Sequence, residues 1–404
     1  MKNKLIILIA PNVSEQMGGE AIKALQIFQQ YKKIHADTLQ ITHERNRSEI
    51  ETRLRLTNVY FVKDNFVSIF LWKSVIFHML LDVWFSIKAV QLAEKIAEER
   101  GFKNEHVIIH QTEPNSPVSP RKTSKRHINV FGPINGNIYY PKIFHKNEKF
   151  IAKLRRLLHL PLQRLNAIFF KGLSKSDTIF VAGGSRTYES LIAGGCSQKI
   201  MIETLDCGIN DSILDRPRVE HKGENFRYVH FGRLVFHKCT FLIILSLLKT
   251  KLPICLDIVG TGPELEACKK LVVELNLQER VNFLGWYTNH SDLFDSFSKY
   301  RGVILPSIED ANGIVIQEAM AVGLPPICLD WGGPQLLIDH NVNGYLIEPV
   351  TVEHITTQMA KYLDILSANG DLAESFSIDA RLKAESWRWS EVAKVWLNHY
   401  AKIK

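Results

Sequence analysis

The chain has 404 residues, a length that allows two or three domains, each with a hydrophobic core of its own. Hydrophobic residues account for 46% and charged residues for 23%, which is typical of a soluble globular protein and gives no support to a disordered or fibrous one. The net charge of +8 favours an anionic partner, such as a phosphorylated small molecule, a nucleic acid or a lipid headgroup. None of the six cysteines forms a CxxC pair, and we expect them to be reduced and buried.

The amino-terminal stretch predicts the first strand of a buried parallel sheet. Its apolar run, Leu5 to Ala10, is shorter than the roughly 7–15 apolar residues of a signal peptide, and no small-residue cleavage site follows. We therefore expect a strand of a cytoplasmic protein. Gly18 and Gly19 then form a loop that opens a helix within residues 17–33.

Residues 66–90 form the most hydrophobic segment of the chain. Lys73, His78 and Asp82 interrupt it, and such groups are unfavourable in the middle of a bilayer. The segment predicts a buried helix, or one that lies on a membrane, rather than a membrane span.

The rest of the amino-terminal half alternates strands and helices. Residues 105–114 predict a strand that ends in a polar loop, and residues 129–141 predict a Gly/Pro loop. Residues 149–175 predict a basic amphipathic helical region interrupted near Pro161, and residues 177–184 predict a strand. Such alternation indicates a parallel α/β sheet.

The same pattern repeats after a polar, turn-rich joint at about residues 205–225. We expect strands near residues 226–234, 281–286, 300–307 and 325–333, helices near 240–249 and 313–323, and a strand–turn–helix unit over 254–275. The fold class is therefore α/β, with two Rossmann-like parallel-sheet domains: residues 1–210, completed by a helix at 385–404, and residues 211–384. Open parallel sheets bind ligands beyond the carboxyl ends of their strands, so two such domains with those ends facing would form a cleft.

Two motifs in the second half follow strands. In VGTGPELE (259–266) the third glycine position is Leu265, so the motif fits a tight strand-to-helix turn as well as a phosphate loop. In HFGRLVFHK (230–238), Arg233 and Lys238 lie in a loop where two cations can hold a diphosphate at two points. A chance surface pair is the alternative.

The stretch PSIEDANGIVIQEAMAVGLPPI, residues 306–327, places carboxylates beside a helix start. We expect Asn312 and Gly313 to begin the helix, with free amides beside Asp310 that attract phosphate or hydroxyl oxygens. Glu318 lies about a turn and a half further on, among apolar residues that leave little polar face. A carboxylate that bridges two vicinal hydroxyls, such as those of a ribose, explains Glu318 better than a solvated one.

These motifs resemble the retaining glycosyltransferases of family 4, also called group 1. The resemblance rests on GRLVFHK, VGTGPE, the acid pattern from Asp310 to Glu318 followed by AMAVGLP, and PPICLDWGGPQLLIDHNVNGYLIEP, in this order. It is close over residues 225–350 and looser in the amino-terminal half, through MGGEAIKAL, IIHQTEPNSPVSP and FGPINGNIYYP. It implies the GT-B fold, in which two Rossmann-like domains flank a cleft.

The resemblance also implies a donor site. Arg233 and Lys238 would bind the donor diphosphate, Glu318 the ribose and Asp310 the transferred sugar, with backbone amides nearby. The residues expected to hold the donor are Gly18, Gly19, Gly232, Arg233, Lys238, Gly260, Gly262, Glu309, Asp310, Asn312, Gly313, Ile314 and Glu318. Those expected to take part in catalysis are Arg233, Lys238, Asp310 and His110.

The sequence departs from the family pattern in two places. The family usually has glutamate where Asp310 stands, and the shorter side chain leaves open whether Asp310 or Glu309 contacts the sugar. Residues 205–210, LDCGIN, replace an asparagine–glycine pair often found in the hinge loop. In the amino-terminal half, His110 ends a strand and is expected to contact the donor sugar or the acceptor; a structural histidine is the alternative, and Thr112, Glu113 and Asn115 are the other candidates for that contact.

The sequence therefore predicts a retaining glycosyltransferase that moves a sugar from a UDP-sugar or GDP-sugar to a glycan or lipid-linked glycan in bacterial cell-surface polysaccharide synthesis. No D-x-D pair occurs, so we expect no required metal, and we expect no cofactor and no nucleic-acid partner. A same-fold sugar-nucleotide epimerase and a non-catalytic glycosyltransferase-like protein are alternatives. A nicotinamide-dependent oxidoreductase is a third, but the missing third glycine and the lack of an early fingerprint count against it.

Residues 146–175 predict contact with an anionic membrane surface. A basic amphipathic helix can lie on anionic lipid, and a lipid-linked acceptor would require such contact. We expect peripheral binding to the inner face of the cytoplasmic membrane; an ordinary helix packed on the sheet with a solvated basic edge is the alternative. The single acid of the segment is Glu148, and its cations are Lys146, Lys149, Lys153, Arg155, Arg156, Arg164, Lys171 and Lys175.

Overall fold

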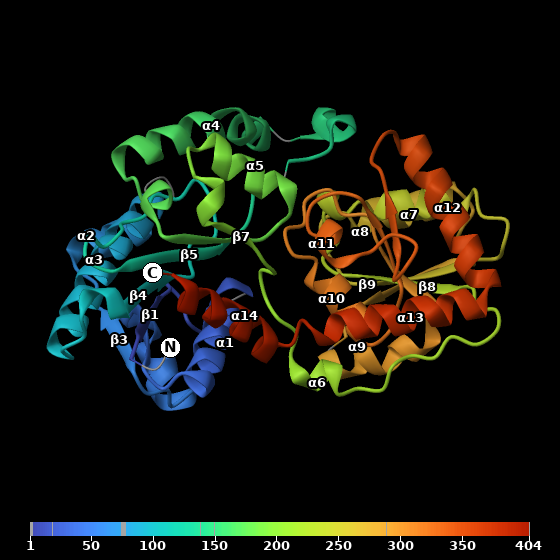
Figure 1. The fold of residues 1–404 in the computed structure, drawn as a ribbon. Coiled ribbons are helices and arrows are strands. Elements are labelled where there is room, and N and C mark those ends of the chain that lie inside the picture. The colour runs from blue at the N-terminus through green and yellow to red at the C-terminus, as the bar shows by residue number, and fades with distance from the viewer. Residues whose placement is uncertain are drawn as a thin grey trace. The chain divides into compact units, whose positions relative to one another are not determined.

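The computed structural model describes residues 3–17, 19–73, 78–137, 139–148, 150–287 and 289–403. The chain divides into two compact units, each built on a parallel sheet (Figure 1). The amino-terminal unit comprises Met1–Asn137, Leu154–Cys207 and Trp389–Lys404, and the carboxy-terminal unit comprises Ile138–Lys153 and Gly208–Arg388.

The amino-terminal unit has a seven-stranded parallel sheet in the order β3-β2-β1-β4-β5-β6-β7. Its strands are β1 Leu5–Ile9, β2 Thr38–His43, β3 Val59–Val62, β4 Val107–Gln111, β5 Ile128–Ile134, β6 Thr178–Val181 and β7 Met201–Glu203. Its helices are α1 Gly19–Ile34, α2 Phe66–Lys73, α3 His78–Glu99, α4 Phe150–Phe169, α5 Ser185–Ala193 and α14 Trp389–Lys402.

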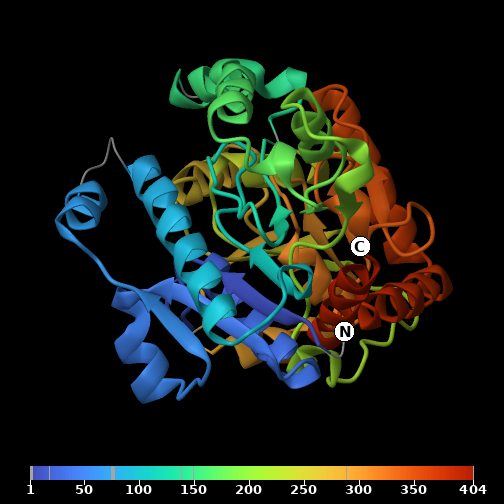
Figure 2. The same cartoon turned by 60° about the vertical axis from the view of Figure 1, so that its left-hand side comes forward.

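Strand β1 is apolar throughout because both faces of the sheet are covered. Ile6 and Leu8 pack with residues of α1 and α14, whereas Leu5, Ile7 and Ile9 pack with residues of α3. Figures 1 and 2 show the carboxy-terminal helix α14 lying beside α1, next to the strands that begin the chain. The end of the sequence therefore completes the core that its beginning starts.

The carboxy-terminal unit has a six-stranded parallel sheet in the order β10-β9-β8-β11-β12-β13. Its strands are β8 Arg227–Phe231, β9 Cys255–Val259, β10 Val281–Gly285, β11 Gly302–Leu305, β12 Pro326–Leu329 and β13 Tyr345–Ile347. Its helices are α6 Asp211–Leu214, α7 Thr240–Leu247, α8 Leu265–Glu274, α9 His290–Ser296, α10 Ile314–Ala321, α11 Pro334–Leu337, α12 Val352–Ala368 and α13 Gly370–Glu385.

The segment before α4 belongs to the carboxy-terminal unit, although the predicted boundary assigned all of residues 1–210 to the first domain. Phe144 is 2% exposed within the hydrophobic core of the carboxy-terminal unit, and the Trp331 indole Nε1 donates to the Tyr139 carbonyl oxygen at 2.7 Å. The return to the amino-terminal unit falls at Trp389 rather than residue 385.

Three predicted local structures differ from those observed. The Gly/Pro loop expected at 129–141 begins as strand β5, whose pairing with β6 shifts register between Phe131 and Ile134. The helix expected to break near Pro161 continues through it as α4. The apolar segment 66–90 contributes to two helices, α2 and α3; residues 74–77 of that prediction lie outside the described residues.

No helix among the described residues is both long enough and apolar enough to cross a membrane.

Candidate functional site

The strand order of the carboxy-terminal sheet reverses between β8 and β11, and ligands of open parallel sheets bind beyond the carboxyl ends at such a point. Two loops follow these strands, residues 232–239 after β8 and residues 306–313 after β11. The His237 carbonyl oxygen accepts from the Ile308 amide at 2.9 Å and from the Ser307 hydroxyl at 3.2 Å, so the two loops are held side by side.

Gly260 and Gly262, which are predicted to contact the donor, allow the loop after β9 to pass in contact with the loop after β8. Gly260 has φ +142°, and a Cβ there would lie 1.9 Å from the Gly232 carbonyl oxygen; a Cβ at Gly262 would lie 2.1 Å from the Leu234 oxygen. The Leu234 amide in turn donates to the Thr261 oxygen at 2.9 Å. Packing alone requires glycine at 260 and 262, so their contact with a donor remains a prediction.

Lys238 and Asp310, both predicted site residues, form an ion pair between the two loops. Lys238 Nζ lies 2.6 Å from Asp310 Oδ2, and both side chains are largely shielded from solvent. The other oxygen, Asp310 Oδ1, accepts from the Gly313 amide at 3.0 Å, where the backbone turns left-handed (φ +60°) before α10. Asp310 therefore holds Lys238 and the start of α10 together.

Arg233 is exposed, and the hydrogen bonds and ion pairs within the described residues give it no protein partner. The positive charges of Arg233 and Lys238 nevertheless both act on His237. Burial lowers the pKa of His237, the positive charges of Lys238 and Arg233 lower it further, and the carboxylates of Glu309 and Asp310 oppose them. Two cations and two acids thus surround His237 at the end of β8.

Glu318 lies one helical turn after Ile314, on the same side of α10. Ile314 is 49% exposed, whereas the opposite side of the helix, including Ile316 and Ala319, is buried. The Glu318 side chain is half-buried, and burial raises the pKa of its carboxyl group to about 7. No hydrogen bond or ion pair among the described residues engages this carboxyl group, which leaves it available to a ligand.

Four further residues are predicted to hold the donor: Glu309, Asn312, Gly19 and Gly18. Glu309 is partly exposed, and Asn312 donates from Nδ2 to Gln317 Oε1 at 3.1 Å. Gly19 is the first residue of α1, where a Cβ would meet nothing within 4 Å. Gly18 lies outside the described residues.

The structure corrects the prediction for His110, which lies in the core and does not end its strand at an open surface. Its exposure is 0%; Nε2 donates to the Gly132 carbonyl oxygen at 2.6 Å, and Nδ1 accepts from the Tyr400 hydroxyl of α14. The Tyr31 hydroxyl donates to Tyr400 in turn, at 3.0 Å. Burial lowers the pKa of His110 to about 4, which keeps the ring neutral and suits it to joining α14 to the sheet.

The amino-terminal sheet has its own reversal of strand order, between β1 and β4, and two of the alternatives to His110 lie beyond it. Glu113 is 4% exposed and its Oε1 has no hydrogen-bond partner; burial and then Glu20 raise its pKa to about 8. Asn115 Nδ2 donates to Glu20 Oε1 at 3.2 Å. Thr112, by contrast, donates to the Ile9 carbonyl oxygen within the sheet.

Sequence reasoning missed a buried ion pair beside Glu113. Lys23 of α1 is 5% exposed, and its Nζ lies 2.7 Å from Asp206, which also accepts from Asn135 at 2.9 Å. Burial lowers the pKa of Lys23, but Asp206 and Glu113 outweigh that effect and raise it. The apolar pattern of α1 gave no signal that Lys23 faces inward.

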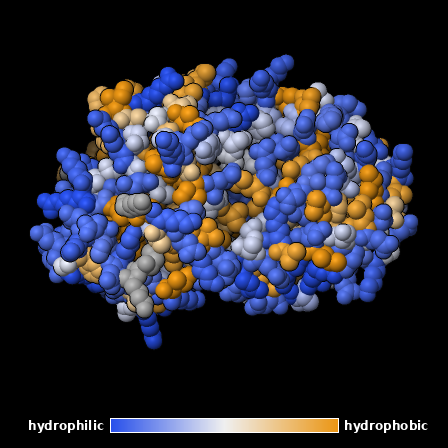
Figure 3. Space-filling model, viewed as in Figure 1, coloured by the Kyte–Doolittle hydropathy of each residue, from blue (hydrophilic) through white to orange (hydrophobic). Residues whose placement is uncertain are grey.

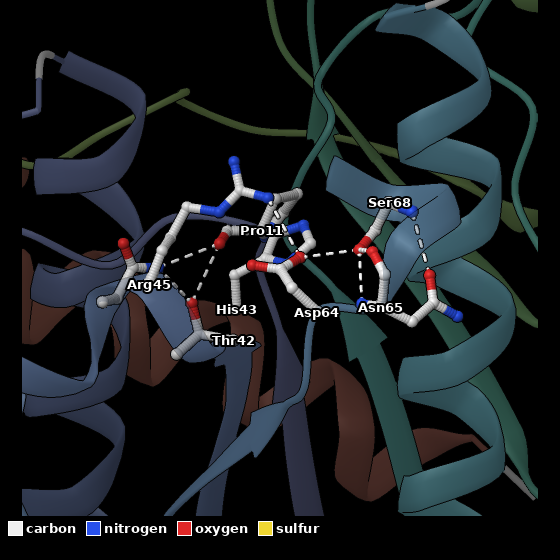
Figure 4. Close-up of polar contacts among 8 residues, drawn as sticks. Pro11, Thr42, His43, Arg45, Asp64, Asn65 and Ser68 are labelled. Carbon is white, nitrogen blue, oxygen red and sulfur yellow. Dashed lines mark hydrogen bonds and ion pairs between the residues drawn. The ribbon is translucent and has the colours of Figure 1, made fainter. Parts of the chain in front are cut away.

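A second unpredicted network ties the ends of β1, β2 and β3 to α2 (Figure 4). Asp64 Oδ1 accepts from the Ser68 hydroxyl at 3.0 Å and lies 3.6 Å from His43 Nδ1. Asn65 and Ser68 exchange hydrogen bonds between side chain and backbone at 2.9 and 2.8 Å, which is a capping box at the start of α2. The contacts of Asp64, Asn65 and Ser68 explain how the start of α2 is fixed.

The described residues contain no group of three or more His, Cys, Asp or Glu side chains placed to hold a metal ion.

Comparison with known proteins points to one family. Residues 211–382 match the family model described as "Glycosyl transferases group 1". An uncharacterized glycosyltransferase of Haemophilus influenzae is 34% identical over 142 residues, which are 35% of this chain and 38% of that protein. The first curated relatives are thus matched over less than half of their own length.

Solved structures resemble the whole chain. The apo form of the lipopolysaccharide outer core galactosyltransferase WaaB has a TM-score of 0.68 at 16% identity, with 99% of both chains covered. An Anabaena protein solved in complex with UDP has a TM-score of 0.65 at 16% identity, and 99% of this chain and 100% of that chain are covered. At these identities the likeness establishes the shared fold, the two parallel-sheet domains of GT-B proteins.

Proposed function

We propose that this chain is a group 1 glycosyltransferase, a retaining enzyme that transfers a sugar from a nucleoside-diphosphate sugar to a glycan; the match of residues 211–382 to that family model supports the proposal. The observation that supports this most directly is that the segments after β8 and β11 carry an exposed arginine, Arg233, and a half-buried carboxyl group, Glu318, that has no hydrogen bond or ion pair among the described residues. Arg233 suits a phosphate, and Glu318 suits a pair of ribose hydroxyls.

In the proposed reaction Arg233 and Lys238 stabilise the negative charge that develops on the departing diphosphate. The acceptor hydroxyl oxygen attacks the sugar carbon from the face that the diphosphate leaves, so the configuration is retained, and its proton passes to the departing phosphate oxygen. Asp310 acts as a positioning residue, because its carboxylate already holds Lys238 and the Gly313 amide.

We propose UDP as the donor nucleotide, with GDP as the alternative, because the Anabaena structure of the same fold is described as a complex with UDP. The acceptor is proposed to be a glycan or lipid-linked glycan of bacterial cell-surface polysaccharide synthesis, acted on at the inner face of the cytoplasmic membrane. The name of the lipopolysaccharide galactosyltransferase of the same fold supports that choice.

A donor panel tests the proposal. The purified chain is incubated with UDP-sugars and GDP-sugars in the presence of EDTA, and released nucleoside diphosphate is measured together with the anomeric configuration of the product. We expect one donor to release its diphosphate and yield a product of retained configuration. Sugar-nucleotide isomers without diphosphate release would identify an epimerase instead, and binding without either product would identify a non-catalytic protein.

A further inference from the structure

Helix α4 presents its apolar side chains to solvent. Among the described side chains of the helix, eight large apolar ones are 42% to 78% exposed: Phe150, Leu154, Leu157, Leu158, Leu162, Leu165, Ile168 and Phe169. In an ordinary surface helix the apolar side packs on the core and the polar side meets water, so the arrangement here is reversed. We call these eight residues the α4 face.

Polar contacts fix the helix in this orientation. Gln163 is buried; its Nε2 donates to the Ser190 carbonyl oxygen at 2.8 Å, and its Oε1 accepts from the Ser190 hydroxyl at 2.9 Å. Asn166 donates to the Val118 carbonyl oxygen. A Cβ at Gly194 would lie 2.4 Å from Gln163 Nε2, so the end of α5 fits closely against this side.

The two sides of α4 are nearly opposite. At about 100° per residue, the α4 face spans an arc of roughly 140°, and Gln163 points away from its middle. Rotating the helix to bury the apolar side would therefore break the contacts to Ser190 and Val118. Figure 3 shows hydrophobic residues interspersed with hydrophilic ones along the edge where Figure 1 places α4.

The charged residues of α4 and of the segment that directly follows it have one sign. Residues 150–175 contain no aspartate or glutamate. The exposed cations Lys153 and Arg164 lie along one border of the face by helical spacing, and the exposed Lys171 follows the end of the helix. A surface of this size that is both apolar and cationic matches the interface of an anionic bilayer, where apolar side chains enter the acyl boundary and cations meet phosphate headgroups.

We propose that the α4 face docks this protein onto an anionic lipid membrane, with α4 lying in the plane of the interface. A second copy of the chain fits the face less well, because pairing two such faces would bring their cations together. The proposal rests on the proposed function in one respect: a lipid-linked acceptor would explain why the protein is at the membrane. Docking itself requires no transfer.

Co-sedimentation of the full chain with vesicles tests the charge requirement. We expect pelleting with vesicles that contain phosphatidylglycerol, little pelleting with phosphatidylcholine alone, and release at high salt. Reversing two bordering charges, Arg164→Glu with Lys171→Glu, should lower the partition coefficient by about tenfold or more. The matched control reverses two exposed lysines of the carboxy-terminal unit, Lys222→Glu with Lys270→Glu, and should remain within about twofold of wild type.

A second variant tests the apolar requirement. Leu157→Gln, Leu165→Gln and Ile168→Gln together keep good helix formers on α4 and should abolish pelleting at any salt concentration. The control changes exposed apolar residues elsewhere, Val273→Gln, Leu382→Gln and Val395→Gln, and should pellet as wild type does.

Three results would overturn the proposal. The first is that wild type fails to pellet with anionic vesicles at low salt. The second is that the α4 variants and their controls lose pelleting equally. The third is that wild type binds no vesicles but is a dimer in sedimentation velocity, whereas the α4 glutamine variant is a monomer. UDP calorimetry on the same proteins distinguishes failure of membrane docking from failure of the proposed donor site, because an α4 variant should bind UDP as wild type does.

Discussion

At the scale of single residues, burial moves the pKa of Glu318 and that of His110 in opposite directions, and in each case it favours the neutral form. It raises the pKa of Glu318 to about 7 and lowers that of His110 to about 4. His110 has partners at both ring nitrogens within its own unit. Glu318 has none among the described residues, which is the condition expected of a group reserved for a ligand.

Replacing Glu318 with glutamine should stabilise the protein while weakening its ligand binding. The folded-state pKa lies above the ordinary 4.5, so folding opposes ionisation and stability falls as pH rises from about 4.5 to 7, then levels off. Glutamine cannot ionise. We therefore expect Glu318→Gln to be about 1–3 kcal/mol more stable than wild type at pH 8 and similar at pH 4 by urea unfolding.

The same variant should bind UDP about tenfold or more weakly in calorimetry, because it loses charge-assisted hydrogen bonds. Glu266→Gln, an exposed acid on α8, serves as the control and should change neither property. A Glu318→Gln variant that is less stable at pH 8 and binds UDP normally would show that the carboxylate serves the fold.

At the scale of elements, Asp310 joins the loop after β8 to the start of α10 through its two oxygens. Asp310→Asn keeps an oxygen for the Gly313 amide but loses the charge paired with Lys238, whereas Asp310→Ala loses both. We expect the alanine variant to be about 1 kcal/mol less stable than the asparagine variant in urea unfolding. We expect UDP affinity to fall less in Asp310→Asn than in Lys238→Ala, because the lysine is retained and only the partner that positions it loses its charge. A larger fall in Asp310→Asn than in Lys238→Ala would mean that Asp310 itself contacts the ligand.

The elements also show why the sequence predicted one half of the molecule better than the other. Around β8, β9, β11 and α10, apolar runs end in glycines and charged residues, so strand ends and site residues could be located together. His110 could not be assigned from its strand, because both faces of that sheet are covered and alternation gives no direction. The helix that covers its face, α14, comes at the end of the chain, and the polar strand β2 gave no apolar signal.

At the scale of the whole molecule, three buried neutral histidines should make the protein sensitive to acid. Burial lowers the pKa of His43, His110 and His230 to about 4 each. Their stabilising contribution is complete above the ordinary pKa of about 6.5 and is lost as pH falls through 4, because protonation then favours the unfolded chain. The carboxyl groups of Glu113 and Glu318 oppose this loss, because burial raises their pKa to about 8 and about 7. Urea unfolding of wild type and of His230→Gln isolates the contribution of one ring: wild type should lose more stability than the variant between pH 7 and pH 4, and equal losses would contradict the burial of His230.

The division of the chain leads to a truncation experiment. Removing residues 389–404 deletes Trp396 and Tyr400, which are fully buried against the amino-terminal sheet, and leaves the carboxy-terminal sheet intact. We expect the truncated chain to lose the cooperative unfolding of the amino-terminal unit, seen as rapid proteolysis before residue 138, while it still binds UDP. Loss of UDP binding with an intact amino-terminal unit would contradict this division.

The central claim is that Arg233 and Lys238 bind a nucleoside diphosphate beyond the ends of β8 and β11, and titration calorimetry with UDP and with uridine tests it most directly. We predict that Arg233→Ala and Lys238→Ala each weaken UDP binding by about 10- to 100-fold, while uridine, which has no phosphate, binds all three proteins equally. UDP affinity that is unchanged in both variants would place the diphosphate elsewhere and contradict the account.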